Sequence, residues 1–321
     1  NAGNSIASGG NYNVVVGDEA GTALTTGDNN VAVGYGALDL EDTGTNSVAV
    51  GYNALTTQNN DTANYNVAVG SSAGASVTTG TLNTLIGGLA GDALTSGNSN
   101  VGVGYQSLTN DTLGDRNVAI GVSSLGTQNF TTSTDSYNVA VGYDAGGDIT
   151  TGLNNTLIGG VAGNALTDAD FNTAVGYTAL GSDTLGSRST ALGYAALNTQ
   201  NFTSATNSYN VAVGHTAGGA VTTGVYNTLL GGLAGDALTD ADYNVAVGGG
   251  SLGSDTLGTR TVAIGTNTLA TQNFTTATNT YNVAVGHHAG LSVTTGLQNT
   301  LIGGLAGDAL TTGSYNVALG M

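Results

Sequence analysis

One five-residue phrase, typified by Asn66-Val67-Ala68-Val69-Gly70, recurs along the chain and limits its fold more than any other feature. The closing glycine of the phrase occurs eighteen times, beginning with Gly17, Gly34 and Gly51. The interval pattern 17, 17, 17, 21 is repeated three times, and this superperiod relates four glycines, Gly70, Gly142, Gly214 and Gly286. A short fixed period is typical of a solenoid, in which each unit buries its apolar face only by stacking on its neighbours.

The composition of the repeat favours strands over helices. The chain of 321 residues contains 54 Gly, and the repeated phrase is rich in Val, Ile, Leu and Thr. We therefore predict an all-β fold, a parallel β-solenoid (β-roll) of about eighteen coils with one 17-residue repeat in each coil and a 72-residue superperiod. We expect residues 1–12 to form an entering half-coil and residues 13–321 to form a single continuous solenoid, because the repeat keeps its register from Asn13 onward.

The predicted strand is apolar on both faces. When the phrase glycine is position 0, position −1 is Val, Ile or Leu and position −3 is Val or Thr in all eighteen coils. Position −2 is always apolar or Gly, as at Ala68, Leu85 and Gly102. Such a pattern is typical of a strand buried on both faces. One face must point into the coil, and the other needs a cover that a single solenoid does not supply.

Two further positions are predicted to be structural. Position −4 is Asn in fifteen coils, with Ser47, Ser189 and Thr261 as the exceptions. We expect these asparagines to hydrogen-bond to their copies in neighbouring coils. The glycine at position 0 indicates a bend with no room for a Cβ atom or with a positive φ. At the corresponding points of the superperiod, these structural residues are Asn66, Asn138, Asn210 and Asn282 together with Gly70, Gly142, Gly214 and Gly286.

Positions +4 and +7 change together. Where +4 is Gly, as at Gly91, +7 is apolar, as at Leu94. Where +4 is Leu, as at Leu108, +7 is polar, as at Asp111. We interpret this rule as one interior volume that is filled once in each coil, from either of two positions, because filling both would overpack the core and filling neither would leave a cavity.

The 21-residue coils insert four residues at the same place, as in Gln128-Asn129-Phe130-Thr131. Two interpretations of the inserted phenylalanines remain open. Each ring folds back over the roll, or the rings form a repeated contact site for a surface glycan or a neighbouring chain. The candidate binding residues in the second interpretation are Phe130, Phe202 and Phe274.

The charge balance excludes some classes of partner. Three Arg, no Lys and 21 acidic residues give a net charge of −18, which argues against nucleic-acid binding. There is no Cys, so disulfides and thiolate chemistry are absent. No apolar run approaches the length of about 18 residues that a membrane span requires, so we expect no membrane insertion of this segment.

Few residues suggest chemistry. His215 corresponds to Tyr143 and Ser71 in earlier superperiods, which disfavours a catalytic or metal-binding role at that position; the other histidines are His287 and His288. The carboxylates of the turn containing Asp236, Asp240 and Asp242 could suit Ca²⁺, but the copies of this turn differ, and solvated turn carboxylates are the simpler interpretation. We predict no enzyme activity, no catalytic residues, no metal site and no cofactor. Rim ion pairs are expected at Arg116, Arg188 and Arg260.

Units such as residues 30–46 (NVAVGYGALDLEDTGTN) and 172–188 (NTAVGYTALGSDTLGSR) resemble the head repeats of trimeric autotransporter adhesins and the repeats of phage-type tail-fibre proteins. The resemblance covers nearly the whole chain. It implies a left-handed parallel β-roll, an assembly of three chains and a role in adhesion at a cell or virion surface. The coils of adhesin heads are usually shorter than the 17-residue coils of this chain.

Three hypotheses follow. The first is a non-enzymatic extracellular fibre segment, structural or adhesive and homotrimeric, that binds other copies of itself and a cell-surface glycan or protein. The second is a filament subunit that stacks head to tail by strand addition. The third is an ice-binding rod with Thr ladders, which we disfavour because pairs such as Thr78-Thr79 and Thr222-Thr223 occur in too few consecutive coils.

Overall fold

The computed structural model describes residues 1–321 and confirms the all-β parallel solenoid of about eighteen coils. Its contacts divide the chain into two compact units, residues 1–160 and residues 161–321, and each is described by itself. The coil strands of the first unit are β1 (Val14–Val16), β2 (Val31–Val33), β3 (Val48–Val50), β4 (Val67–Val69), β5 (Thr84–Ile86), β6 (Val101–Val103), β8 (Val118–Ile120), β10 (Val139–Val141) and β11 (Thr156–Ile158).

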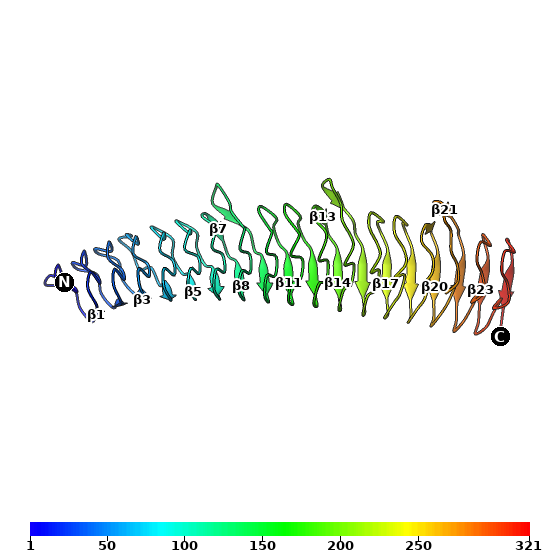
Figure 1. Cartoon of the computed structure of the whole chain (residues 1–321), viewed down its shortest axis with the longest axis horizontal. Helices are drawn as coiled ribbons and strands as arrows, with labels where there is room; N and C mark the ends of the chain where they lie inside the picture. Colours follow the sequence, from blue (N-terminus) through cyan, green and yellow to red (C-terminus); the bar gives the residue numbers. More distant parts are fainter. The chain divides into compact units, whose positions relative to one another are not determined.

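The second unit repeats this arrangement. Its coil strands are β12 (Thr173–Val175), β14 (Thr190–Leu192), β16 (Val211–Val213), β17 (Thr228–Leu230), β18 (Val245–Val247), β20 (Val262–Ile264), β22 (Val283–Val285), β23 (Thr300–Ile302) and β24 (Val317–Leu319). Short strands within the insertions are β7 (Gly114–Asp115), β9 (Thr134–Asp135), β13 (Gly186–Ser187), β15 (Thr206–Asn207), β19 (Gly258–Thr259) and β21 (Thr278–Asn279). In Figure 1 the coil strands of each unit lie side by side, while β7 and β13 lie at the opposite ends of their coils.

Successive strands pair in parallel and in repeat register. Ala68 of β4 pairs with Leu85 of β5, so that position −2 meets position −2 of the next coil. Ala212 of β16 pairs with Leu229 of β17 in the same way. An insertion does not shift this register, because Ala119 of β8 still pairs with Ala140 of β10 across the first 21-residue interval. The extra residues are therefore accommodated entirely at the turn.

The two faces of the strand have different surroundings. The position −2 side chains, such as Ala68 and Leu85, are fully buried inside the coil. The position −1 side chains point outward, where Val69 is 37% and Ile86 is 39% exposed. The strand is apolar on both faces, but only its inward face is buried within this chain. The outward Val, Ile and Leu side chains are left partly exposed to solvent.

The phrase glycine forms a tight backbone stack, as predicted. Gly70 has a φ of +143°, and a Cβ atom on it would lie 2.4 Å from the carbonyl oxygen of Gly87 in the next coil. Gly214 has a φ of +139°, and its Cβ atom would lie 2.6 Å from the carbonyl carbon and oxygen of Gly231. Only glycine fits, because both the backbone angle and the close approach of the next coil exclude a side chain.

The asparagine at position −4 is buried and bonds in two directions. Asn66 Nδ2 donates to the carbonyl oxygen of Gly80, on the far side of the same coil, at 2.7 Å. Asn66 Oδ1 accepts the backbone N–H of Asn83 in the next coil at 2.9 Å. The predicted ladder therefore exists, but its regular link runs from side chain to backbone. Direct side-chain links occur at some steps, as from Asn155 Nδ2 to Asn138 Oδ1 at 3.3 Å.

The three exceptions at position −4 lie in coils that carry extra residues. Ser47 accepts a hydrogen bond from Gln58 Nε2 at 2.8 Å, and Ser189 accepts one from Gln200 Nε2 at 2.8 Å. In these coils a buried glutamine thus contacts the short side chain at position −4. The same glutamine accepts from the next asparagine, as Gln200 Oε1 does from Asn210 Nδ2 at 2.8 Å.

Core packing explains, as expected, why the residue types at positions +4 and +7 change together. A Cβ atom on Gly91 would lie 2.7 Å from Leu85 Cδ2 and 2.9 Å from Leu94 Cδ1, so these two leucines already fill the space. Where +4 is Leu, as at Leu108, that side chain is fully buried. The polar side chain at +7 is buried as well, since Asp111 is 0% exposed. The interior of these coils therefore contains an apolar part and a separate polar part.

Residues 1–12 contain turns and no strand. Their backbone nevertheless bonds to the first coil, because Gly3 N–H donates to the Ala20 carbonyl and Ala7 N–H to the Thr25 carbonyl, each at 3.0 Å. The left-handed sense of the coils, which the resemblance implies, stays a prediction.

Candidate functional site

The inserted phenylalanines lie inside the coils. Phe130 and Phe202 are 5% exposed and Phe274 is 7% exposed. The backbone N–H of Phe202 donates to the buried Asp183 Oδ1 at 3.1 Å, which holds the inserted turn over the coil. This burial favours the folded-back interpretation, and a contact role for Phe130, Phe202 and Phe274 stays a prediction. The physical reason is that an apolar ring lowers its free energy by covering the end of the coil.

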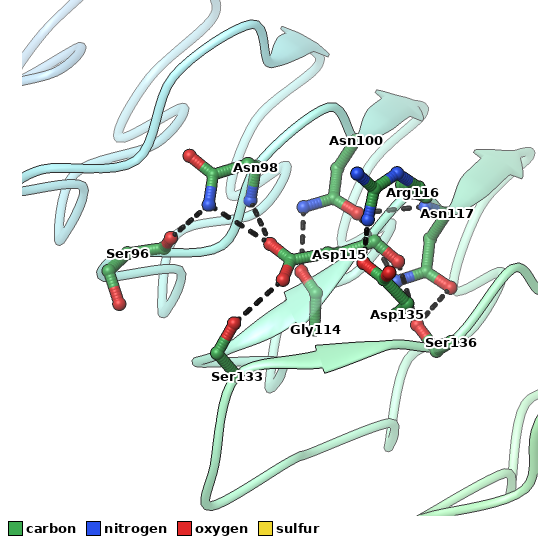
Figure 2. A network of polar contacts seen from close by, with 10 residues as sticks. All are labelled: Ser96, Asn98, Asn100, Gly114, Asp115, Arg116, Asn117, Ser133, Asp135 and Ser136. Atoms are coloured by element: carbon green, nitrogen blue, oxygen red, sulfur yellow. Dashed lines mark hydrogen bonds and ion pairs between the residues drawn. The ribbon is translucent and has the colours of Figure 1, made fainter.

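A polar network closes the first insertion (Figure 2). Asp115 Oδ1 accepts from the backbone N–H of Asn98 at 2.6 Å and from Asn98 Nδ2 at 3.1 Å. Asp115 Oδ2 accepts from Ser133 Oγ at 2.9 Å. Ser136 Oγ donates to Asn117 Oδ1 at 2.8 Å. The network joins the insertion to the two coils that precede it, so we assign it a structural role.

A buried carboxylate precedes each enlarged coil. Asp111 Oδ1 accepts from the backbone N–H of Gly114 at 3.0 Å, and Asp111 Oδ2 accepts from Gln128 Nε2 at 2.5 Å. Burial raises the pKa of the Asp111 carboxyl above its ordinary value, although the hydrogen bond from Gln128 opposes this shift. Equivalent carboxylates with 0% exposure occur at Glu41, Asp183 and Asp255. All four accept hydrogen bonds from a glutamine in the next coil.

The three arginines lie at the outer rim of the coils. Arg116 forms the expected ion pair with Asp135. The partner becomes asparagine in the next superperiod, where Arg188 Nε donates to Asn207 Oδ1 at 3.0 Å. Arg260 also bonds to an asparagine. The prediction of rim ion pairs is therefore confirmed at Arg116, while the other two arginines make neutral hydrogen bonds.

The histidines lie among exposed side chains of the turns. The His215 ring stacks on Tyr194 with a centroid separation of 5.0 Å. His287 and His288 stack on each other at 3.8 Å, and His288 Nε2 lies 3.3 Å from Asn267 Nδ2. His215 thus continues a column of side chains from successive coils, whereas His287 and His288 are neighbours within one coil.

The aspartates of the candidate calcium turn bond to the preceding coil. Asp240 Oδ1 accepts from Thr223 Oγ1 at 2.7 Å, and Asp242 Oδ1 accepts from the backbone N–H of Val225 at 2.8 Å. Partial burial raises the pKa of Asp236. Nowhere in the structure do three His, Asp or Glu side chains gather in a geometry that could hold a metal ion. There is also no pocket in the structure.

Two exposed features of each unit remain as the candidate functional surface. We define the outer face as the outward side chains at positions −3 and −1. Its exposed apolar members include Val69, Ile86, Ile120 and Ile158 in the first unit and Ile264 and Ile302 in the second, with exposures between 37% and 42%. An apolar surface of this kind, repeated in every coil, is typical of an interaction site.

Tyrosines border the outer face. All fourteen tyrosines of the chain lie at position −5 or position +1, and we call these two positions the tyrosine columns. Every one of them is exposed, from 44% at Tyr35 to 86% at Tyr12. In the second unit, Tyr226 stacks between Tyr209 and Tyr243 with centroid separations of 5.1 Å on both sides. Tyr177 stacks on Tyr194 at 6.0 Å in the other column.

Charge is unevenly distributed around the coil. Asp18 is the one carboxylate of 21 that lies between positions −5 and +1, whereas all three arginines lie at position −5. The amino group of Asn1 holds the pKa of Asp18 below its ordinary value. The nearby Glu19 carboxylate raises the pKa of the Tyr35 phenol above its ordinary value. The outer face and its tyrosine columns are thus almost free of negative charge on a strongly acidic chain.

Comparison of the chain with protein-family models, with curated proteins and with solved structures gives no match. None of the segments in the structure forms an apolar helix long enough to cross a membrane.

Sequence reasoning found the doubly apolar strand but missed the tyrosine column at position −5. The signal was present, because every tyrosine outside position +1 falls at this position. Position −5 adopts a positive φ in the structure, for example 58° at Tyr226 and 59° at Arg260. Such angles are uncommon for bulky side chains, so the residue type does not reveal the conformation.

Proposed function

We propose that this chain is a segment of a non-enzymatic extracellular fibre, structural or adhesive, whose outer face packs against other copies of the chain. The proposal is carried by one observation: the outward Val, Ile and Leu side chains form an apolar, almost carboxylate-free surface on a chain with a net charge of −18. Copies that meet through this surface bury apolar area and keep their acidic turns apart.

The available area supports an interface between copies. The second unit has seven tyrosines, each roughly half exposed or more, and a half-exposed tyrosine offers about 100 Å² of surface. The tyrosine columns of one unit alone therefore offer about 700 Å², and a standard stable interface buries about 800 Å² on each partner. The outward strand side chains between the columns add to this area.

The assembly that we propose is a homotrimer at a cell or virion surface. It is favoured by the resemblance of the repeats to those of trimeric adhesin heads and phage-type tail fibres. The acidic turns then face outward, and they are the surface that we propose for contact with a cell-surface glycan or protein. The proposal requires no catalytic residue, metal or cofactor.

Light scattering on the full chain tests this proposal. We expect three times the chain mass of 31.3 kDa. The double variant Ile264→Asp and Ile302→Asp places charge on the outer face and should lower the mass to that of one chain, with the circular dichroism unchanged. Ala277→Asp, on an exposed part of the third insertion, is the matched control and should stay trimeric.

Two outcomes would reject the homotrimer. A wild-type chain that is monomeric at all concentrations would leave the outer face uncovered. A mass that grows continuously with concentration would instead support the head-to-tail filament formed by strand addition.

A further inference from the structure

The tyrosine columns hold pairs of phenols in contact along the chain. Tyr209, Tyr226 and Tyr243 form a three-ring stack, with interplanar angles of 20° and 7° between successive rings. In the first unit Tyr35 stacks on Tyr52 with a centroid separation of 5.5 Å. These partners come from successive coils, and the 44% to 55% exposure of their side chains leaves them open to solvent.

Arginines bound the three-ring stack at both ends. The guanidinium carbon of Arg188 lies 5.9 Å from the centroid of the Tyr209 ring, and that of Arg260 lies 5.0 Å from the centroid of the Tyr243 ring. The rings of Tyr209 and Tyr243 thus have Tyr226 on one side and an arginine on the other. Each end phenol therefore has a single phenol neighbour in its column, which is Tyr226.

The composition leaves tyrosine as the main oxidisable side chain of this surface. The chain has no Cys and no Trp, and its single Met is the terminal Met321. A chain without cysteine cannot join its coils by disulfides. Stacked phenols offer a different oxidative link, because two adjacent tyrosines can form a carbon–carbon bond.

We propose that the tyrosine columns are a site of oxidative cross-linking, at which stacked tyrosines of successive coils are converted to dityrosine by hydrogen peroxide and a peroxidase. Each phenol loses one electron and one proton to give a phenoxyl radical. The two radicals form a bond between the ring carbons next to their oxygens, and the hydrogen on each of these carbons moves to the phenol oxygen. The chain loses two hydrogen atoms, and one peroxide is reduced to two waters.

The fold favours this reaction within one chain. The parallel pairing of β16 with β17 and of β17 with β18 fixes the spacing of the three tyrosines, so that the two radicals need not diffuse to meet. Each link closes one repeat of the chain into a loop, from Tyr209 to Tyr226 or from Tyr226 to Tyr243. Such a link reduces the number of conformations open to the unfolded chain, as a disulfide does. The inference concerns contacts within one chain, and it applies to a chain whose tyrosine columns are not covered by another copy.

The experiment treats the dilute full chain with peroxide and horseradish-type peroxidase, and then maps linked peptides by mass spectrometry. Tyr105 serves as an internal control, because its column neighbours are Gly88 and Val122. Oxidation of the terminal methionine adds an oxygen and is distinguished by mass. We expect links that lack two hydrogens between the stacked partners, which are Tyr209 and Tyr226, Tyr226 and Tyr243, Tyr35 and Tyr52, and Tyr177 and Tyr194.

Two phenylalanine variants sharpen the test. Tyr226→Phe keeps a stacked ring but removes the central phenol, and it should abolish both links of the three-ring stack while the link between Tyr35 and Tyr52 persists. Tyr105→Phe should leave every link unchanged. The cross-linked wild type should also unfold at a higher temperature than the untreated chain, whereas treated Tyr226→Phe should show a smaller increase.

Some results would overturn the proposal. Equal coupling of Tyr105 and of the stacked tyrosines would show that the columns do not direct the reaction. Links found only in covalent chain dimers, or a dityrosine yield that Tyr226→Phe does not reduce, would show that the stacked pairs are not the site.

Discussion

The side chain of Asn66 spans the interior of its coil and donates from Nδ2 to the carbonyl oxygen of Gly80, 14 residues further on, at 2.7 Å. The same contact recurs between Asn210 and Gly224 at 2.7 Å in the second unit. Because the other end of the amide accepts the backbone N–H of the next coil, one buried side chain closes its own coil and fixes the spacing to its neighbour. The repeat is held together at this position as well as through its strands.

Replacing Asn66 with alanine should therefore destabilise the chain by about 2 to 4 kcal/mol, because it leaves the Gly80 carbonyl and the Asn83 N–H buried without partners. Urea unfolding followed by circular dichroism measures the change. Asn59→Ala is the control, since Asn59 is exposed, and it should change stability by less than about 0.5 kcal/mol. Equal effects of the two substitutions would contradict the assigned role of Asn66.

Gly214→Ala should be destabilising by about 3 kcal/mol or more, because alanine strains the backbone at a φ of +139° and its Cβ atom would meet Gly231 at 2.6 Å. Gly249→Ala is a matched control in the same unit. The nearest atom to a Cβ there is the Gly232 carbonyl oxygen at 3.8 Å, and the backbone angle is not positive. Thermal unfolding of both variants tests the prediction, and a loss of stability at Gly249 as large as at Gly214 would refute it.

Phe202→Ala should destabilise the second unit by about 3 kcal/mol, because the ring is 5% exposed and its removal leaves a cavity beside Gly186. Thr203→Ala, at the next and exposed position, should have little effect. Denaturant midpoints of the two variants provide the comparison. If the Phe202 variant were as stable as the wild type, the ring would not be part of the core.

The pH dependence of stability should carry a contribution from Asp111, whose pKa burial raises above the ordinary value of 3.8. A carboxyl with a higher pKa in the folded than in the unfolded state binds protons more readily when folded, so its contribution to stability is lost as pH rises through the folded pKa. The wild type should thus lose stability relative to Asp111→Asn as pH rises from about 3.8. Urea unfolding of both proteins across this range tests the sign, and a constant difference would contradict it.

The periodic sequence by itself determined the solenoid, its register and the bend at the phrase glycine. Identical residues at a fixed spacing can stack only if each repeat occupies the same place in its coil, as the pairing of Ala68 with Leu85 shows. The insertions of four residues were also recognisable, because they interrupt the period without changing the phrases on either side.

Only the tertiary structure decided which side chains enter the coil. Val69 and Ala68 are both apolar, but the path of the turns directs Ala68 inward and leaves Val69 partly exposed. Asp111 is acidic and Phe130 lies in an insertion, yet both are buried, because Gln128 of the next coil donates a hydrogen bond to the first and the coil offers an apolar surface to the second. The type of a residue indicates only whether its side chain is polar or apolar. The direction in which the side chain points depends on backbone angles that the neighbouring coils impose.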